Sequence, residues 1–227
     1  MLQFSGGIDS LATLFLKQPE WENITVVWVN TGAAYPDTLE LMAAVKAIVP
    51  QFVEINSPKS IWELANGAAV DLLPVDRTPL GQAIRGIQRP MFTDYLQCCG
   101  ANIWYPLAEW AKANGATHII RGQRNSERRK APYPIRDGFV DADGVVYEFP
   151  VEGWSKEAVF AFCREVCPVF IPEYYATEKT SHDCWDCIAY LDENKQRIAN
   201  LPSAKRAYVE DRLAKYREAL KETSYVY

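Results

Sequence analysis

The sequence predicts an α/β fold in which helices cover both faces of a mostly parallel sheet. Apolar runs of strand length alternate with segments of helical periodicity up to residue 122. The run ITVVWVN at 24–30 is apolar without alternation, which is typical of a strand covered on both faces. A Ser-Gly-Gly turn at 5–7 joins the first short apolar run directly to a helical pattern. This order of elements favours parallel strands joined by helical crossovers.

The expected elements can be justified one by one. Leu11, Leu14 and Phe15 recur at helical spacing behind the glycines, and a proline opens the second helical pattern. In chain order, the expected elements are a strand at 1–4, the first helix, a strand at 24–30, a helix at 36–49, a strand at 51–58, a helix ending at Gly115 and a strand at 117–122. Residues 59–97 are less regular, and a charged amphipathic helix after Leu201 is expected to serve packing or dimerisation.

Length and composition exclude some classes of protein. The chain has 227 residues, of which 48% are hydrophobic and 23% charged, as is ordinary for a globular protein with a buried core. No apolar run approaches the roughly 18 residues of a membrane span, and no signal sequence precedes the first strand. We therefore expect a cytoplasmic protein with no membrane partner. The net charge of −5 argues against a nucleic-acid coat protein, although one local segment is basic.

The turn SGGIDS at 5–10 lies where the first strand meets the first helix. The first N–H groups of a helix lack partners within it and carry the positive end of its dipole, so they favour an anion such as phosphate. Gly6 and Gly7 permit positive φ and close approach of the backbone, while Ser5 and Ser10 add hydroxyl donors. The alternative is a tight turn closed by an ordinary cap, with Asp9 or Ser10 as the capping residue.

Other candidate residues fall at the ends of the later strands, where an open parallel sheet binds its ligands. They lie at 30–32 and in the basic segment at 121–130. Arginine makes bidentate, permanently charged contacts to phosphoryl oxygens, so we expect Arg121, Arg124 and Arg128 to neutralise an anion. A solvated loop is the alternative for this segment.

The six cysteines are expected to be ligands or reactive thiols rather than disulfides in a reducing compartment. Thiolate quartets hold zinc or an iron–sulfur cluster, and spacing alone does not separate the two. The candidate ligands are Cys98, Cys99, Cys184 and Cys187. A third alternative is that these four cysteines are free thiols that bind no metal. Cys163 and Cys167 lie four apart on a helical pattern and are expected in the core.

These motifs resemble, in order over residues 1–190, the phosphoadenosine phosphosulfate (PAPS) reductase family of the adenine nucleotide α-hydrolase-like (ATP pyrophosphatase) superfamily. SGGIDS is similar to the SGG-x-DS pyrophosphate loop, VNTGAAYPDT to D-T-G…F-P-E-T, CCGANIWYPL to C-C…K…P-L, IIRGQRNSERRK to G-x-R…S…R, FPVEGWSKEAVFAFC to P…W…V, and HDCWDC to G-C-x-x-C. Two positions depart from the family: Asn30 replaces an Asp, and the Lys after Cys-Cys is replaced in the stretch at 102–104.

The resemblance implies a Rossmann-like, five-stranded, mostly parallel sheet in a nucleotide-binding domain at 1–190, with a C-terminal helical extension at 191–227. It also implies an adenine nucleotide (ATP, PAPS or adenosine phosphosulfate, APS) across the strand ends. The residues that would bind it are Ser5, Gly6, Gly7, Asp9, Ser10, Asn30, Gly32, Arg121, Gly122, Arg124 and Arg128. Of these, Asp9, Arg124 and Arg128 would be catalytic, with Asp9 either binding Mg²⁺ beside ATP or capping the helix.

The CC…C-x-x-C pattern is the one that APS reductases use for a 4Fe–4S cluster. The resemblance therefore implies a 4Fe–4S cluster on Cys98, Cys99, Cys184 and Cys187, with zinc as the alternative. Sulfonucleotide reductases attack sulfur with a cysteine in a C-terminal segment, and this sequence has no cysteine after Cys187.

We therefore expect an enzyme that cleaves ATP, adenylates an acceptor and delivers sulfur to it. A nucleic acid or a sulfur carrier would be its partner, and the tail helix would suit a homodimer. A reductase whose thiol comes from another protein and a non-catalytic nucleotide-binding module are the alternatives.

Overall fold

The computed structural model describes residues 1–58, 98–126, 135–176, 184–187 and 191–222. The chain falls into two compact units. The first consists of Met1–Val29, Tyr35–Ile55 and Leu107–His182, and the second of Asn30–Ala34, Asn56–Pro106 and Asp183–Tyr227. The expected domain boundary at residue 190 adjoins residues outside the described ranges and stays a prediction.

A mostly parallel sheet forms the centre of the first unit. Its six described strands have the order β3-β2-β1-β4-β6-β5. β1 pairs in parallel with β2 and β4, and β4 with β6, whereas β5 runs antiparallel to β6. The strands are β1 (Leu2–Gln3), β2 (Val26–Asn30), β3 (Phe52–Asn56), β4 (His118–Arg121), β5 (Phe139–Val140) and β6 (Val146–Glu148). The predicted α/β class is confirmed, with one strand more than the five expected.

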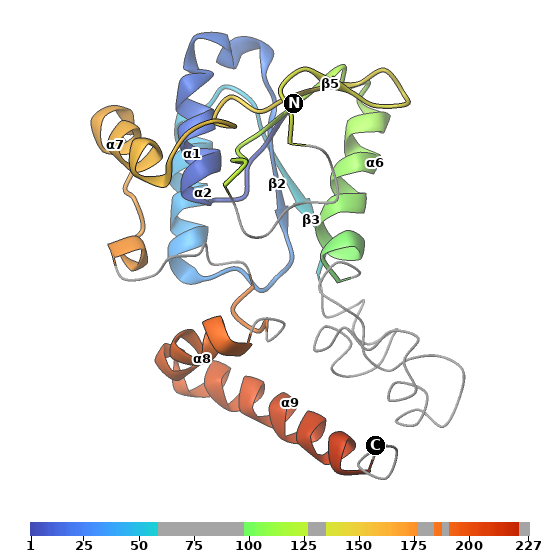
Figure 1. Cartoon of the computed structure of the whole chain (residues 1–227), viewed down its shortest axis with the longest axis vertical. Helices are drawn as coiled ribbons and strands as arrows, with labels where there is room; N and C mark the ends of the chain where they lie inside the picture. Colours follow the sequence, from blue (N-terminus) through green and yellow to red (C-terminus); the bar gives the residue numbers. More distant parts are fainter. Residues whose placement is uncertain (59–97, 127–134, 177–183, 188–190, 223–227) are drawn as a thin grey trace. The chain divides into compact units, whose positions relative to one another are not determined.

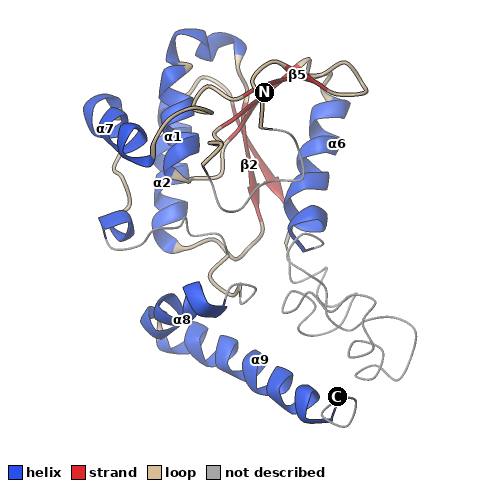
Figure 2. Cartoon of the chain, in the orientation of Figure 1, coloured by secondary structure: helices blue, strands red, loops and turns tan. Residues whose placement is uncertain are grey.

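Helices lie on both faces of the sheet (Figure 1). α1 (Ile8–Leu16) and α2 (Pro36–Ile48) cover one face, and α6 (Tyr105–Ala113) covers the other, with the strands between them (Figure 2). α7 (Lys156–Val166) packs against α1, so α1 is buried around most of its circumference. Two 3₁₀ segments, η1 (Gln18–Asn23) and η3 (Glu173–Ala176), complete the described helical elements of this unit.

The core of the first unit explains why its strands form where they do. Val26, Val27, Trp28 and Val29 are all buried, as expected for a strand that is covered on both faces. On the α6 side, the buried cluster consists of Ala111, Ile119, Tyr147 and Phe149. The apolar positions that predicted β2 and β4 are therefore buried against the helices, together with Tyr147 and Phe149, which come from a region that the sequence did not predict as a strand.

The described part of the second unit is mainly helical. A π-helical turn, η2 (Gly100–Trp104), leads into α6, and two helices follow later in the chain, α8 (Leu191–Asn200) and α9 (Ser203–Glu222). A helix is therefore present where the sequence predicted one after Leu201, as α9. Within the described ranges, no helix combines the length and the apolar character needed to cross a membrane.

Candidate nucleotide site and cysteine loops

The predicted phosphate loop joins β1 to α1. Gly6 has φ of +81°, and a Cβ there would lie 2.9 Å from the terminal carbon of Met42 in α2. Gly7 is the N-cap of α1, with φ −72° and ψ 155°, and no side chain caps the helix. Gly7 therefore does not use the positive φ that glycine permits. The alternative, an ordinary cap by Asp9 or Ser10, is wrong, because Gly7 is the N-cap residue of the helix.

The two serines form a short chain of hydrogen bonds inside the loop. The Gly7 N–H donates to Ser5 Oγ at 3.3 Å, Ser5 donates to Ser10 Oγ at 3.2 Å, and Ser10 donates to the Gly7 carbonyl at 2.8 Å. These hydroxyls hold the backbone of the loop in a fixed curve at the positive end of the α1 dipole. The positive end of a helix dipole favours an anion, so binding of phosphate at this loop stays a prediction.

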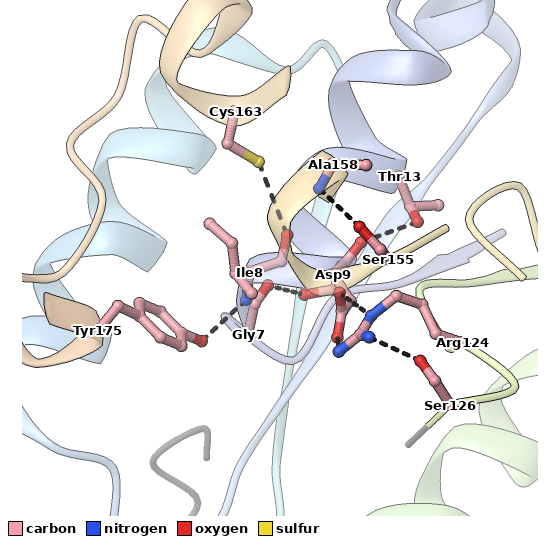
Figure 3. A network of polar contacts seen from close by, with 11 residues as sticks. Gly7, Ile8, Asp9, Thr13, Arg124, Ser126, Ser155, Ala158, Cys163 and Tyr175 are labelled. Carbon is pink, nitrogen blue, oxygen red and sulfur yellow. Dashed lines mark hydrogen bonds and ion pairs between the residues drawn. The ribbon is translucent and has the colours of Figure 1, made fainter. Parts of the chain in front are cut away.

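Tyr175 in η3 also contacts this loop, although it is not among the predicted site residues. The Ile8 N–H in the first turn of α1 donates to the Tyr175 hydroxyl at 2.8 Å (Figure 3). The Tyr175 ring packs against Tyr174 and Phe160, with centroid distances of 4.3 and 5.5 Å. The contact joins residues 167 positions apart, and no local sequence pattern signals it.

Asp9 and Arg124 form an ion pair in the first unit. Arg124 Nε donates to Asp9 Oδ1 at 2.7 Å, and Nη2 donates to Oδ2 at 3.2 Å (Figure 3). Nη1 donates to Ser126 Oγ at 2.8 Å, and Arg124 is only 8% exposed. The structure therefore joins two of the three predicted catalytic residues to each other. Because both Asp9 oxygens accept from Arg124, a Mg²⁺ ion on Asp9 would share this carboxylate with the guanidinium group.

Gly122 explains how the basic segment reaches α1. A Cβ at Gly122 would lie 2.5 Å from the carbonyl carbon and oxygen of Asp9 and from Cα of Ser10. The chain leaving β4 thus passes directly over the backbone of the first turn of α1, which only glycine allows. This close approach places Arg124, two residues later, beside Asp9.

Of the two other arginines predicted to bind an anion, the structure describes Arg121 but not Arg128. Arg121 is the last residue of β4 and is in register with Gln3 of β1, at the edge of the sheet from which the phosphate loop departs. Arg128 lies outside the described residues, so its contact with an anion stays a prediction.

In the second unit, the turn after β2 is closed by Asn30. The Gly32 N–H donates to Asn30 Oδ1 at 2.9 Å, and Gly32 has φ of +77°. Asparagine therefore supplies the acceptor for this turn at the position where the resembled family has aspartate. The neutral amide makes the same turn without adding a negative charge.

The C-x-x-C loop lies against this turn within the second unit. Cys184 forms an antiparallel bridge with Ala34, and the Trp185 N–H donates to the Ala33 carbonyl at 2.8 Å. Thr31 Oγ1 lies 3.3 Å from Cys184 Sγ. Two motifs far apart in sequence, N-T-G and C-x-x-C, are thus brought into contact.

α9 contacts the same cysteine loop through three side chains. Arg212 Nη1 lies 3.6 Å from Asp186 Oδ2, and both residues are buried. Trp185 packs on the Tyr208 ring with centroids 5.7 Å apart, and Lys205 Nζ lies 4.8 Å from the Trp185 ring centroid. The tail helix is therefore a packing element for the C-x-x-C loop, in line with one of the two roles expected of it.

The first cysteine pair is positioned by the π-helical turn. Cys98 is buried, and Asn102 Nδ2 donates to its carbonyl at 2.8 Å and lies 3.9 Å from its Sγ. All six cysteines are thiols rather than disulfides. Thiolates are the donor chemistry that iron–sulfur clusters and zinc require. In the described parts of the chain, however, no three His, Cys, Asp or Glu side chains are grouped to hold a metal. The convergence of the four candidate ligands stays a prediction.

The other two cysteines lie on α7 in the first unit. Cys163 is completely buried, and its thiol donates to the Ile8 carbonyl at 3.8 Å (Figure 3). Cys167 is the C-cap residue of α7 and is only partly buried. The expected core position is therefore confirmed for Cys163, and Cys167 lies at the margin of the core because the helix ends there.

Comparison with known proteins agrees with the family resemblance. Residues 1–70 match the family described as the phosphoadenosine phosphosulfate reductase domain. An uncharacterized protein of Methanocaldococcus jannaschii is 22% identical over 201 residues, which are 87% of this chain and 43% of that protein. The chain thus spans less than half the length of this relative.

A solved structure supports the fold, although its sequence is only distantly similar to this chain. The crystal structure of a PAPS reductase from Candida auris, in a phosphate complex, matches with a TM-score of 0.52 and 16% identity over 80% of each chain. The chain therefore has the α/β fold of a PAPS reductase, and its first 70 residues are similar to that reductase domain in sequence.

Proposed function

We propose that this protein is an enzyme that binds an adenine nucleotide with its anionic end at the N-terminus of α1. The observation that carries the proposal is the loop at 5–10, which follows a central parallel strand and starts a helix whose N-cap residue, Gly7, has no side chain to cap it. Backbone N–H groups in such a loop neutralise phosphate or sulfate oxygens without a lysine. The match of residues 1–70 to a reductase domain supports the same site.

The reaction we propose is cleavage of ATP between the α- and β-phosphates, with adenylation of an acceptor that then receives sulfur. Ser5, Gly6 and Gly7 would hold the pyrophosphate, and Arg121 and Arg128 would neutralise its charge. The Asp9–Arg124 pair would hold the first turn of α1 in the orientation that aims its N–H groups at the ligand.

We also propose that Cys98, Cys99, Cys184 and Cys187 hold a 4Fe–4S cluster, with zinc as the alternative. Such a cluster would bind or relay sulfide when present. Protein purified without oxygen should be brown and carry about four irons per chain, and Cys184→Ser should lose both the colour and the iron. Cys163→Ser is the matched control and should keep them. One zinc per chain and no colour would overturn the cluster.

A second candidate function is sulfonucleotide reduction with the attacking thiol supplied by another protein. The structural match to a PAPS reductase favours it. The two reactions differ in their products, because the first releases pyrophosphate from ATP and the second releases sulfite from PAPS or APS. Both assays should therefore be run side by side on anaerobic protein, with and without nucleic acid and with and without a dithiol reductant.

The outcome of that experiment decides among the three hypotheses. Pyrophosphate release that Gly6→Val abolishes is the expected result. Thiol-dependent sulfite release without pyrophosphate would favour the second candidate. Nucleotide binding without either product would leave a non-catalytic binding module, and no binding of ATP, PAPS or APS would overturn the nucleotide site itself.

A further inference from the structure

One buried hydrogen-bond acceptor beside the candidate phosphate loop has no donor. In the part of the chain that the structure describes, Gln123 Oε1 is the single buried side-chain nitrogen or oxygen atom without a hydrogen-bond partner. Such an atom destabilises the folded chain, because it has lost its hydrogen bonds to water and gained none in return. Buried polar atoms of this kind are rare in native proteins, so each of them calls for an explanation.

The backbone around Gln123 is fixed against the first turn of α1. Gly122, the residue before it, lies so close to α1 that a Cβ there would be 2.5 Å from the Asp9 carbonyl carbon. Arg124, the residue after it, forms the bidentate pair with the Asp9 carboxylate (Figure 3). Gln123 also follows the last residue of β4 by two positions, so it lies at the carboxyl edge of the sheet, where open α/β sheets bind their ligands. The unpaired acceptor therefore belongs to a segment that borders the candidate phosphate loop.

The next two side chains of this segment find partners within the chain. Arg124 donates to the Asp9 carboxylate, and Asn125 Nδ2 donates to Glu152 Oε1 at 2.8 Å. The segment is thus packed well enough to pair a guanidinium group and an amide group. Loose packing does not account for the unpaired oxygen of Gln123.

We propose that Gln123 Oε1 accepts a hydrogen bond from the nucleoside half of the bound nucleotide, which makes Gln123 a specificity-determining residue. The inference rests on the proposed nucleotide site. An amide oxygen only accepts hydrogen bonds, and the oxygens of ionised phosphate and sulfate also only accept them, so the anionic end of the ligand does not pair with Gln123. The nucleoside half carries the donors, which are the ribose hydroxyls and the amino group of adenine. Binding supplies the missing donor to an acceptor that has already lost its water.

This role bears on which nucleotides the site accepts. A ligand without the donor leaves the amide oxygen buried and unpaired in the complex, and sites built to pair a polar group reject such ligands strongly. If the donor is the ribose 3′-hydroxyl, a 3′-phosphate removes the O–H group and brings an anion to the amide oxygen. PAPS would then bind more weakly than ATP or APS, neither of which has a 3′-phosphate.

Gln123→Met tests the role, because methionine keeps the unbranched shape of the side chain and removes the acceptor. In urea unfolding of the ligand-free full chain, the variant should be at least as stable as the parent, since an apolar group has replaced an unpaired acceptor. In titration calorimetry it should bind ATP about tenfold more weakly. Pyrophosphate has no nucleoside and should bind the variant and the parent equally. Gln51→Met is the matched control, because Gln51 is exposed just before the amino end of β3 and should leave both affinities unchanged.

Three analogues of ATP identify the donor. 2′-DeoxyATP and 3′-deoxyATP each lack one ribose hydroxyl, and inosine triphosphate has a carbonyl oxygen in place of the adenine amino group. One of the three should bind the parent about tenfold more weakly than ATP does, yet bind Gln123→Met as tightly as ATP does, because the two losses concern the same hydrogen bond. Parallel losses for every analogue in the parent and in the variant would overturn the proposal.

The same measurements separate this inference from the proposed function. A parent that binds neither ATP nor pyrophosphate would overturn both. A parent that binds ATP no more tightly than Gln123→Met does would overturn only the role of Gln123, as would a variant that loses affinity for pyrophosphate as well. Lower stability of ligand-free Gln123→Met would also overturn it, because the amide would then have its partner within the chain.

Discussion

The first turn of α1 and the C-x-x-C loop are both candidate sites, but they are held in place by different means. The turn of α1 is fixed by backbone contacts and a bidentate ion pair, with Gly122 lying against Asp9 and Arg124 on its carboxylate. The cysteine loop is fixed by side chains of α9 and by contacts with the turn after β2. The candidate anion site at α1 is therefore built on packed backbone. The C-x-x-C loop, which carries candidate metal ligands, depends instead on the side chains of α9 that pack over it.

Substitution of Gly122 should have the largest effect on the first of these regions. Gly122→Ala places a methyl group 2.5 Å from backbone atoms of Asp9 and Ser10, and backbone cannot move aside as a side chain can. We expect a loss of about 3 kcal/mol in the free energy of unfolding, measured with urea. Gly153→Ala is the control, since a Cβ there meets nothing within 4 Å, and equal stability of the two variants would contradict the close approach.

The ion pair should have the next largest effect. Asp9→Asn and Arg124→Gln should each lower the free energy of unfolding by about 2 kcal/mol, because each leaves a partly buried polar group without its partner. The double variant should be little worse than either single one, which gives a coupling energy of about 1–2 kcal/mol. Fully additive losses in a denaturation series would mean that the two side chains act independently.

In the second region, Arg212→Met should loosen the cysteine loop. The variant loses the contact with Asp186 but keeps most of the apolar stem, so we expect a local loss of about 1–2 kcal/mol. Amide hydrogen exchange of residues 184–187 should become faster by roughly tenfold, while exchange in α1 stays unchanged. Arg206→Met on the exposed face of α9 is the control. Unchanged protection of the loop in Arg212→Met would show that α9 does not hold it.

Tyr175→Phe should have the smallest effect in free energy. It tests whether the N–H groups in the first turn of α1 bind the anion. Removing the hydroxyl releases the Ile8 N–H, which can then donate to an anion instead of to tyrosine. We expect pyrophosphate to bind about fivefold more tightly in titration calorimetry, the equivalent of one hydrogen bond of about 1 kcal/mol. Tyr174→Phe should bind like the parent. Weaker binding in Tyr175→Phe would mean that the hydroxyl itself contacts the ligand.

Much of the fold could be predicted from the sequence because its signals are local. The unbroken apolar run of β2 and the helical spacing of Leu11, Leu14 and Phe15 depend on neighbours within a few residues. The β5–β6 hairpin was missed because its strands have only two and three residues, although the Asp143-Gly144 pair between them is a turn signal. The π-helical turn at Gly100–Trp104 leaves no comparable pattern.

The candidate site could be predicted in its residue types but not in their pairing. Both Asp9 and Arg124 were predicted as site residues, but Arg124 was assigned to an anion and Asp9 to a ligand or a helix cap, and neither was assigned to the other. That pairing depends on β4 lying beside β1, a contact between residues 115 positions apart. Tyr175 was missed for the same reason, since its hydroxyl accepts from Ile8, 167 positions away in the sequence.

The central position of β1 also means that its pairing with β4 is delayed during synthesis of the chain. Its Leu2 pairs with Val26 on one side and with Ile120 on the other, so the second partner is made 118 residues after the strand itself. At about 5–20 residues per second, the ribosome needs roughly 6 to 24 s to supply it. During that interval the strand that carries the phosphate loop is an open edge of the nascent chain. An unpaired edge of this kind presents its backbone N–H and C=O groups to other chains, so the segment that ends in the candidate site is also the one exposed to wrong pairing.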